Sequence, residues 1–228
     1  MSVKLRLENI KDRINKSAIR SGRDPKSVRL VAVSKTVPAN RMKEAIDAGV
    51  DILGENYIQE TRTKFNELAR YPVSWHFIGH LQTNKAKYAV RLFDLIHSVD
   101  SLKLAQELDK QAKKVNKIQE ILIQINIAKE PSKSGADAEN TSNLIKDISC
   151  LENLSVKGLM IMPPFFNDPE KVRPYFSALR EIRDRIHQTV SGVDLYELSM
   201  GLSNDFEAAV EEGATLVRIG TAIFGERQ

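Results

Sequence analysis

A lysine near the start of the chain stands where it can react with a carbonyl group. The stretch VRLVAVSKTVPAN, residues 28–40, is apolar and β-branched up to Val33 and reaches Lys35 just before a Thr-Val-Pro turn. At the end of a buried strand, partial desolvation lowers the pKa of a lysine, and the neutral amine can form a Schiff base with a carbonyl compound. The alternative is an ordinary loop lysine whose ammonium group reaches solvent.

Two segments near the C-terminus contain glycines and hydroxyl residues of the kind that bind phosphate. They are TLVRIGTAIFG, with Gly220 and Thr221, and ELSMGLSND, with Ser199, Gly201 and Ser203. A glycine lets backbone N–H groups approach an anion closely. The structural alternative is that the glycines only form turns and that Ser203 caps a helix.

The elements that position these residues follow from an alternation of short apolar runs with segments of helical periodicity. Strands are expected at residues 30–34, 51–54, 75–79, 95–98, 120–126, 156–160, 196–199 and 216–219. Helices are expected at residues 39–48, 57–69, 84–93, 102–115, 138–148, 169–188 and 205–211. Before the first strand, an amphipathic helix is indicated by Leu5, Leu7, Ile10, Ile14 and Ala18. Candidate helix ends are the caps Asn40 and Ser203 and the glycines Gly49 and Gly213.

About eight strand and helix pairs without a flexible linker predict an α/β fold, a single closed (β/α)8 barrel of the TIM type. We expect one domain over residues 1–228, with residues 1–27 as a helical extension packed on the barrel. An open doubly wound sheet is the alternative. The barrel is favoured because residues with useful chemistry end many different strands, and in a barrel these ends meet at one mouth. Along the chain they are Lys35, Glu55, Asn56, His80, His97, Ser98, Asn126, Met160, Met162, Ser199 and Arg218.

The barrel also predicts that the lysine and the phosphate-binding segments are neighbours. The first strand of a closed barrel pairs with the last, and the loops after the seventh and eighth strands frequently bind phosphate. A phosphorylated aldehyde could therefore bridge Lys35 and the two glycine-containing segments.

Several other residues leave the interpretation open. His76, within the third strand, is expected to be a hydrogen-bonded core histidine. Met160 and Met162 suit packing better than chemistry. The pattern does not decide whether Tyr196 and Glu197 face the inside or the outside of the barrel. The four histidines and one cysteine show no metal-site spacing.

The composition argues for a globular protein of a reducing compartment. Of 228 residues, 42% are hydrophobic and 28% are charged, and 34 basic residues are mixed along the chain with 30 acidic ones. The most basic stretch, residues 11–29, contains no aromatic residue on which bases could stack, which argues against nucleic-acid binding. Cys150 is the single cysteine, so no internal disulfide is possible. No apolar run is long enough for a membrane span or a secretory signal, and a cytoplasmic location is expected.

Six motifs resemble those of a known family. They are VAVSKTVP, GENYIQE, WHFIGHLQTNK, KGLMIMPP, LSMGLSND and VRIGTAIFG, which occur in this order from residue 31 onward. They are similar to motifs of the pyridoxal phosphate homeostasis proteins, whose single domain resembles the barrel domain of bacterial alanine racemases.

The resemblance implies a pyridoxal 5'-phosphate site in which Lys35 holds the cofactor as an internal aldimine. It places Arg218 near the pyridine nitrogen. The implied cofactor-binding residues are Lys35, Asn56, His80, Met160, Ser199, Gly201, Arg218, Gly220 and Thr221, of which Ser199, Gly201, Gly220 and Thr221 surround the phosphate. Lys133 either reaches the phenolic oxygen of the cofactor or is a solvated loop lysine.

The resemblance also implies a role in storing, buffering or delivering pyridoxal phosphate to apoenzymes, with little or no turnover and no catalytic residue. One alternative is an amino-acid racemase, or a related enzyme, that uses Lys35 as a base. Alanine racemases take a second base from an extra domain of a partner subunit, which we do not expect here. Tyr57, His80 or Tyr196 would have to replace it, and a monomer is expected. A cofactor-free Schiff-base aldolase is the third hypothesis.

Overall fold

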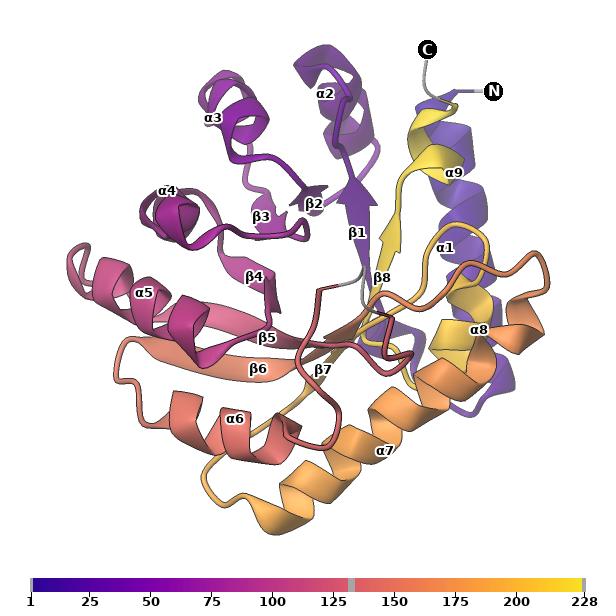
Figure 1. The fold of residues 1–228 in the computed structure, drawn as a ribbon. Coiled ribbons are helices and arrows are strands. Elements are labelled where there is room, and N and C mark those ends of the chain that lie inside the picture. Colours follow the sequence, from indigo (N-terminus) through magenta and orange to yellow (C-terminus); the bar gives the residue numbers. More distant parts are fainter. Residues whose placement is uncertain (1, 131–133, 227–228) are drawn as a thin grey trace.

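The eight strands close into one parallel barrel (Figure 1). A computed structural model of the chain describes residues 2–130 and 134–226. The strands pair in chain order and β1 pairs with β8, which closes the barrel. They are β1 (Arg29–Val33), β2 (Ile52–Glu55), β3 (Ser74–Phe77), β4 (Leu95–Val99), β5 (Gln119–Ile125), β6 (Leu154–Ile161), β7 (Glu197–Ser199) and β8 (Leu216–Ile219). The barrel prediction is confirmed, and the open-sheet alternative is wrong.

Helices surround the barrel on its outside (Figure 1). They are α1 (Val3–Arg20), α2 (Ala39–Asp47), α3 (Ile58–Glu67), α4 (Ala86–Leu92), α5 (Leu102–Lys113), α6 (Thr141–Ser149), α7 (Arg173–Thr189), α8 (Phe206–Glu211) and α9 (Thr221–Phe224). Short 3₁₀ turns occur at Pro25–Ser27, Thr83–Lys85 and Pro169–Lys171. The four residues of α9 are too few to show a helical period in the sequence.

Both predicted helix caps are wrong, whereas both predicted terminal glycines are confirmed. Helix α2 begins directly after Pro38, whose ring already fixes a φ suited to the residue before a helix, so Asn40 lies inside the helix. Asp205, not Ser203, precedes α8. Gly49 and Gly213 follow α2 and α8 with φ of +94° and +105°, a conformation that glycine adopts without a steric penalty.

The core has two parts, one outside and one inside the barrel. The larger cluster lies between the strands and the helices. A separate cluster takes one apolar side chain from each of six strands, as expected for residues that face the barrel axis. Its members are Val31, Ile52, Leu95, Leu122, Met160 and Leu216. Several buried polar side chains, among them His76, His97, Ser199 and Arg218, are described with the candidate site.

Helix α1 packs beside α8 and α9 (Figure 1). Its buried apolar residues are Val3, Leu7, Ile10, Ile14 and Ala18. Leu5, which the sequence pattern placed on this face, is 52% exposed. The reason is helical geometry, because residues 3, 7, 10 and 14 share one face and residue 5 lies across the helix from them.

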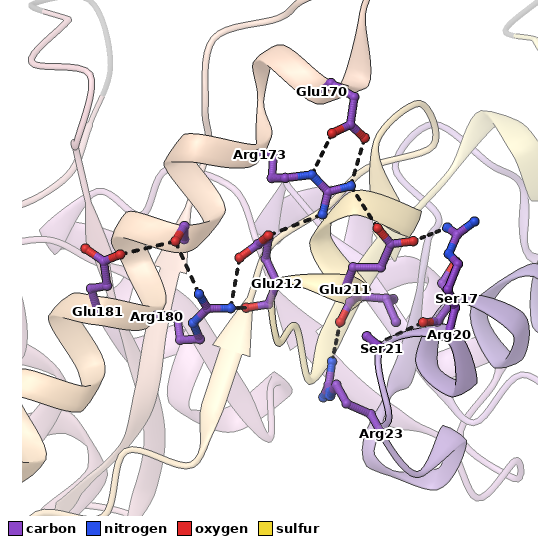
Figure 2. Close-up of polar contacts among 12 residues, drawn as sticks. Ser17, Arg20, Ser21, Arg23, Glu170, Arg173, Arg180, Glu181, Glu211 and Glu212 are labelled. Carbon is purple, nitrogen blue, oxygen red and sulfur yellow. Dashed lines mark hydrogen bonds and ion pairs between the residues drawn. The ribbon is translucent and has the colours of Figure 1, made fainter.

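An ion-pair network ties α1 to α7 and α8 (Figure 2). Arg173 of α7 pairs with Glu170, Glu211 and Glu212. Glu211 also pairs with Arg20 of α1. Burial opposes ionisation of Glu211, yet the hydrogen bonds from Arg173 and Arg20 lower its pKa on balance. The network therefore favours charged Glu211 and fixes the orientation of α1.

Candidate cofactor site

Lys35 lies two residues after β1 and lines a hollow of about 720 Å³ at the carboxyl ends of the strands. Gly220 and Thr221, which follow β8, line the same hollow, because β1 and β8 are paired. Arg6 and Arg41 add positive charge to its wall. The volume is in the range of small-molecule sites. The structure thus brings the predicted amine and part of the predicted phosphate-binding segment together.

The chain around Lys35 is held in an uncommon conformation. Thr36 has φ of 62°, which is an outlier for a β-branched residue. Its backbone N–H donates to Glu60 at 2.6 Å, and the buried hydroxyl of Ser34 donates to Glu55 at 2.7 Å. Both chain neighbours of Lys35 are therefore anchored to carboxylates, one from α3 and one from the end of β2.

Lys64 of α3 connects these anchors. Its ammonium group is buried and donates to the carbonyl oxygen of Ser34 at 2.6 Å, to Glu55 at 2.8 Å and to Glu60 at 2.6 Å. The three acceptors match the three protons of an ammonium group. Burial raises the pKa of Glu55, and the hydrogen bond and charge of Lys64 offset part of that rise. We call Lys64, Glu55 and Glu60 the Lys35 clamp.

Asn56 presents an unpartnered acceptor at the end of β2. Its Oδ1 atom is buried and has no hydrogen-bond partner among the described residues. The backbone of Asn56 is also approached closely by Gly79, where a Cβ atom would lie 2.3 Å from the carbonyl oxygen of Asn56. A buried acceptor without a partner is costly, so this amide is a candidate for binding a ligand.

Arg218 is a buried cation in the barrel interior, 2% exposed. Its guanidinium donates to Ser199 Oγ at 2.6 Å, to the carbonyl oxygen of Ile161 at 2.8 Å and to Met162 Sδ at 3.1 Å. Burial lowers its pKa to about 10, and the charge of Asp205 opposes this shift, so Arg218 is cationic at neutral pH. None of the ion pairs found among residues 2–130 and 134–226 includes Arg218. A buried cation without a paired carboxylate points to a binding role.

Ser199, His97 and His76 continue inward from Arg218, and with it they form what we call the interior polar line. Ser199 Oγ lies 2.8 Å from His97 Nδ1, and His97 Nε2 lies 3.0 Å from His76 Nδ1. The pKa of His76 is lowered to about 3, chiefly by burial and also by the charge of Arg29, while Asp94 opposes part of the shift. Burial also lowers the pKa of His97 well below 6.5, as do His76 and Arg218. Both imidazoles are therefore neutral at neutral pH.

Met160, Met162 and His80, which lie at or near the carboxyl ends of strands of the barrel, differ in their exposure to solvent. Met160 is 1% exposed and belongs to the inner apolar cluster, whereas Met162 is 38% exposed and contacts Arg218. His80 is exposed, and its Nδ1 lies 3.0 Å from the hydroxyl of Ser134. The roles of Met160 and His80 toward a cofactor stay predictions.

The segment after β7 has both structural and candidate binding residues. Gly201 has φ of +91°, and a Cβ atom there would lie 2.6 Å from that of Ala209, so packing against α8 requires this glycine. Ser203 and Thr221 bring two hydroxyl groups to 3.3 Å from each other. The hydroxyl of Ser199 contacts Arg218 and His97, so the structure associates it with the arginine end of the site.

The other candidates of the sequence interpretation lie elsewhere. Lys133 lies outside the described residues. Tyr196 immediately precedes β7 and lines a second hollow of about 590 Å³ at the opposite mouth of the barrel, so it cannot replace a catalytic base beside Lys35. Tyr57 is 55% exposed. Lys64 and Glu60 were not anticipated, because a lysine and a glutamate four residues apart on a helix are typical of a solvated surface pair.

Comparison with known proteins decides the family. Residues 5–228 match the alanine racemase N-terminal domain family. A pyridoxal phosphate homeostasis protein of Aquifex aeolicus (strain VF5) is 46% identical over 223 residues, which cover 98% of this chain and 97% of the relative. The chain belongs to the pyridoxal phosphate homeostasis protein family. The recognition from six sequence motifs is confirmed.

Solved structures agree with this family. PipY of Synechococcus elongatus PCC7942, with pyridoxal phosphate bound, is 36% identical with a TM-score of 0.87, and the match covers 98% of this chain and 100% of PipY. An alanine racemase of Clostridium difficile 630 is 16% identical with a TM-score of 0.79 and covers 99% of this chain and 60% of the racemase. At 16% identity the likeness to the racemase shows the barrel fold alone.

Proposed function

We propose that this chain binds pyridoxal 5'-phosphate, carries it on Lys35 through a Schiff base and serves its storage, buffering or delivery, with little or no turnover. The observation that carries the proposal is that Lys35, Gly220 and Thr221 line one hollow. An amine is thereby placed beside a segment with a glycine and a hydroxyl group. When bound, pyridoxal phosphate supplies an aldehyde that condenses with amines and a ring that withdraws electrons.

The other residues of the mouth fit the remaining parts of the cofactor. The hydroxyls of Thr221 and Ser203 suit the phosphate, together with the backbone at Gly220. Arg218 can only donate hydrogen bonds, so a ring nitrogen that faces it accepts a hydrogen bond and is unprotonated. The unpartnered Oδ1 of Asn56 is a further polar group for the ligand.

Arg218 also supports the expectation of little turnover. A carboxylate beside the ring nitrogen would keep the nitrogen protonated and make the ring a strong electron sink. The cation of Arg218 has the opposite effect and weakens the stabilisation of a carbanion at the substrate. Holding the cofactor requires only the attachment point and the phosphate contacts.

The proposal includes the setting in which the protein works. We infer a monomer that acts in the cytoplasm and makes transient contact with apoenzymes that need the cofactor. The free thiol of Cys150 is exposed, which suits a reducing compartment. Among the described residues, no helix is long and apolar enough to cross a membrane.

A spectrum followed by chemical trapping tests the proposal. The purified protein, incubated with pyridoxal phosphate, should show a visible absorption band that is lost on borohydride reduction, and peptide mapping should locate the reduced adduct on Lys35. Lys35→Ala should abolish the band while the thermal unfolding curve stays close to that of the wild type. Lys43→Ala, at an exposed position of α2, is the matched control and should retain the band.

Three results would change the conclusion. A visible band that persists in Lys35→Ala would show that another residue is the attachment point. Sustained exchange of the α-proton of an amino acid in deuterated water would favour the racemase or a related enzyme. A colourless protein that borohydride links to Lys35 only when a carbonyl substrate is present would favour the cofactor-free aldolase.

A further inference from the structure

The interior polar line crosses the barrel from one mouth to the other. Arg218 and Ser199 belong to neighbouring strands, β8 and β7, and His97 and His76 belong to β4 and β3. Strands β4 and β7 are not neighbours in the barrel, so the contact between His97 and Ser199 must pass through the interior. The far end, His76, lines the hollow of about 590 Å³ together with Arg29, which starts β1. The strand starts form the mouth opposite to Lys35.

The hydrogen-bond direction along the line follows from the arginine. Arg218 has no acceptor, so Ser199 Oγ accepts from it. Among the described residues, His97 Nδ1 is the remaining partner of the Ser199 hydroxyl, which therefore donates its own proton there. His97 must then carry its proton on Nε2 and donate it to His76 Nδ1. His76 in turn carries its proton on Nε2, toward the opposite mouth.

The same order requires both histidines to be neutral. A protonated His97 could not accept from Ser199 and would add a second cation close to Arg218. Burial keeps His97 neutral, and His76, Arg218 and Arg29 have the same effect on its pKa. For His76, Arg29 favours the neutral form and Asp94 opposes it. With both histidines neutral, Arg218 donates to Ser199, Ser199 to His97 and His97 to His76, and no contact in the interior polar line brings two donors or two acceptors together.

We propose that His97 and His76 are positioning residues for Arg218, which hold Ser199 as its acceptor and so fix the guanidinium toward the ring of bound pyridoxal phosphate. This inference rests on the proposed function. Without His97 the Ser199 hydroxyl can rotate among its staggered positions, and Arg218 loses a fixed partner. A change at His76, at the opposite mouth, should therefore alter the surroundings of the cofactor ring.

The first test uses the ligand-free protein. Long-range proton–nitrogen spectra of protein with ¹⁵N-labelled histidine report which ring nitrogen carries the proton. Both His76 and His97 should be neutral at pH 7 with the proton on Nε2. A proton on Nδ1 of His97, or a cationic His97, would overturn the inference whether or not the cofactor binds.

The second test compares His76→Leu with His76→Asn. Asparagine keeps an acceptor close to the position of Nδ1, whereas leucine removes it. His76→Leu should raise the Kd for pyridoxal phosphate by about three- to tenfold, the effect of one hydrogen bond, and should shift the ring-nitrogen resonance of ¹⁵N-labelled cofactor. His76→Asn should stay near the wild-type values. If both folded variants match the wild type, the inference is wrong; if the wild type itself fails to bind, the proposed function is wrong.

Discussion

The ammonium nitrogen of Lys64 lies 2.6 Å from the carbonyl oxygen of Ser34, the residue immediately before Lys35. A lysine of an outer helix thereby reaches through to the chain that carries the candidate attachment point. The side chain of Lys64 is only 8% exposed, and its two carboxylate partners, Glu55 and Glu60, complete its hydrogen bonds. The Lys35 clamp is thus a structural unit that supports the site without lining its hollow.

Lys64→Met should lower the free energy of unfolding by about 3 to 5 kcal/mol, because it leaves the buried carboxylate of Glu55 without its counter-charge. Urea denaturation would measure the change. Lys16→Met is the matched control, since Lys16 pairs with Asp12 on an exposed helix face and should cost less than about 0.5 kcal/mol. Adding Glu55→Gln to Lys64→Met should recover part of the loss. Equal effects of the two lysine variants would argue against the clamp.

Thr36→Asn should raise the free energy of unfolding by about 0.5 to 1 kcal/mol. The φ of Thr36 is 62°, and asparagine tolerates this region better than a β-branched residue does. Asn116 offers the reverse substitution, because it is exposed and has φ of 50°. Asn116→Thr should destabilise the protein by a similar amount. Thermal and urea unfolding of both variants would test the pair, and changes of the same sign would contradict the strain at Thr36.

The stability of the protein should depend on His76 below pH 6.5. Its pKa is lowered from 6.5 to about 3 in the folded protein, so the unfolded chain binds the proton first as the pH falls. The stabilisation is therefore complete above pH 6.5 and is lost progressively toward pH 3, by up to about 1.4 kcal/mol per pH unit. His76→Asn should show a flatter dependence between pH 6.5 and 4.5 in urea titrations. The contributions of the other titrating groups cancel between the wild type and His76→Asn. Identical slopes of unfolding free energy against pH would contradict the lowered pKa of His76.

Glu211→Gln should loosen α1 from the barrel. Glu211 accepts from Arg173 and Arg20, so the substitution removes the charge that both arginines share (Figure 2). We expect a loss of about 1 to 2 kcal/mol and faster amide hydrogen exchange in α1 than in the strands. Because the pKa of Glu211 is lowered, its contribution is present above pH 4.5 and fades as the pH falls further. Glu181→Gln, at a position whose carboxylate accepts from Ser177 at the exposed surface, is the control and should change little.

Sequence alone determined the strands, most helices, the closed barrel and the position of Lys35 after the first strand. Alternating apolar runs and helical periods are local signals, and they placed every strand within two residues of its observed ends. The position of Lys35 directly after the first strand, and of Gly220 and Thr221 after the last, predicted that they share one mouth, since parallel strands in a closed barrel have a common carboxyl end. The hollow that these three residues line agrees with that prediction.

Tertiary structure decided which polar side chains meet across the interior. His97 and Ser199 are 102 residues apart, and no periodicity in the sequence relates them. Residues 160 and 162 are two apart and share one face of the strand pattern, so the sequence did not distinguish Met160, inside the apolar cluster, from Met162, which lies just beyond the end of β6 beside Arg218. The sequence predicts that Lys64 is a solvent-exposed lysine of a helix. Its buried contacts arise because the fold places α3 against the ends of β1 and β2. Long-range packing therefore selects the partners that local sequence patterns leave open.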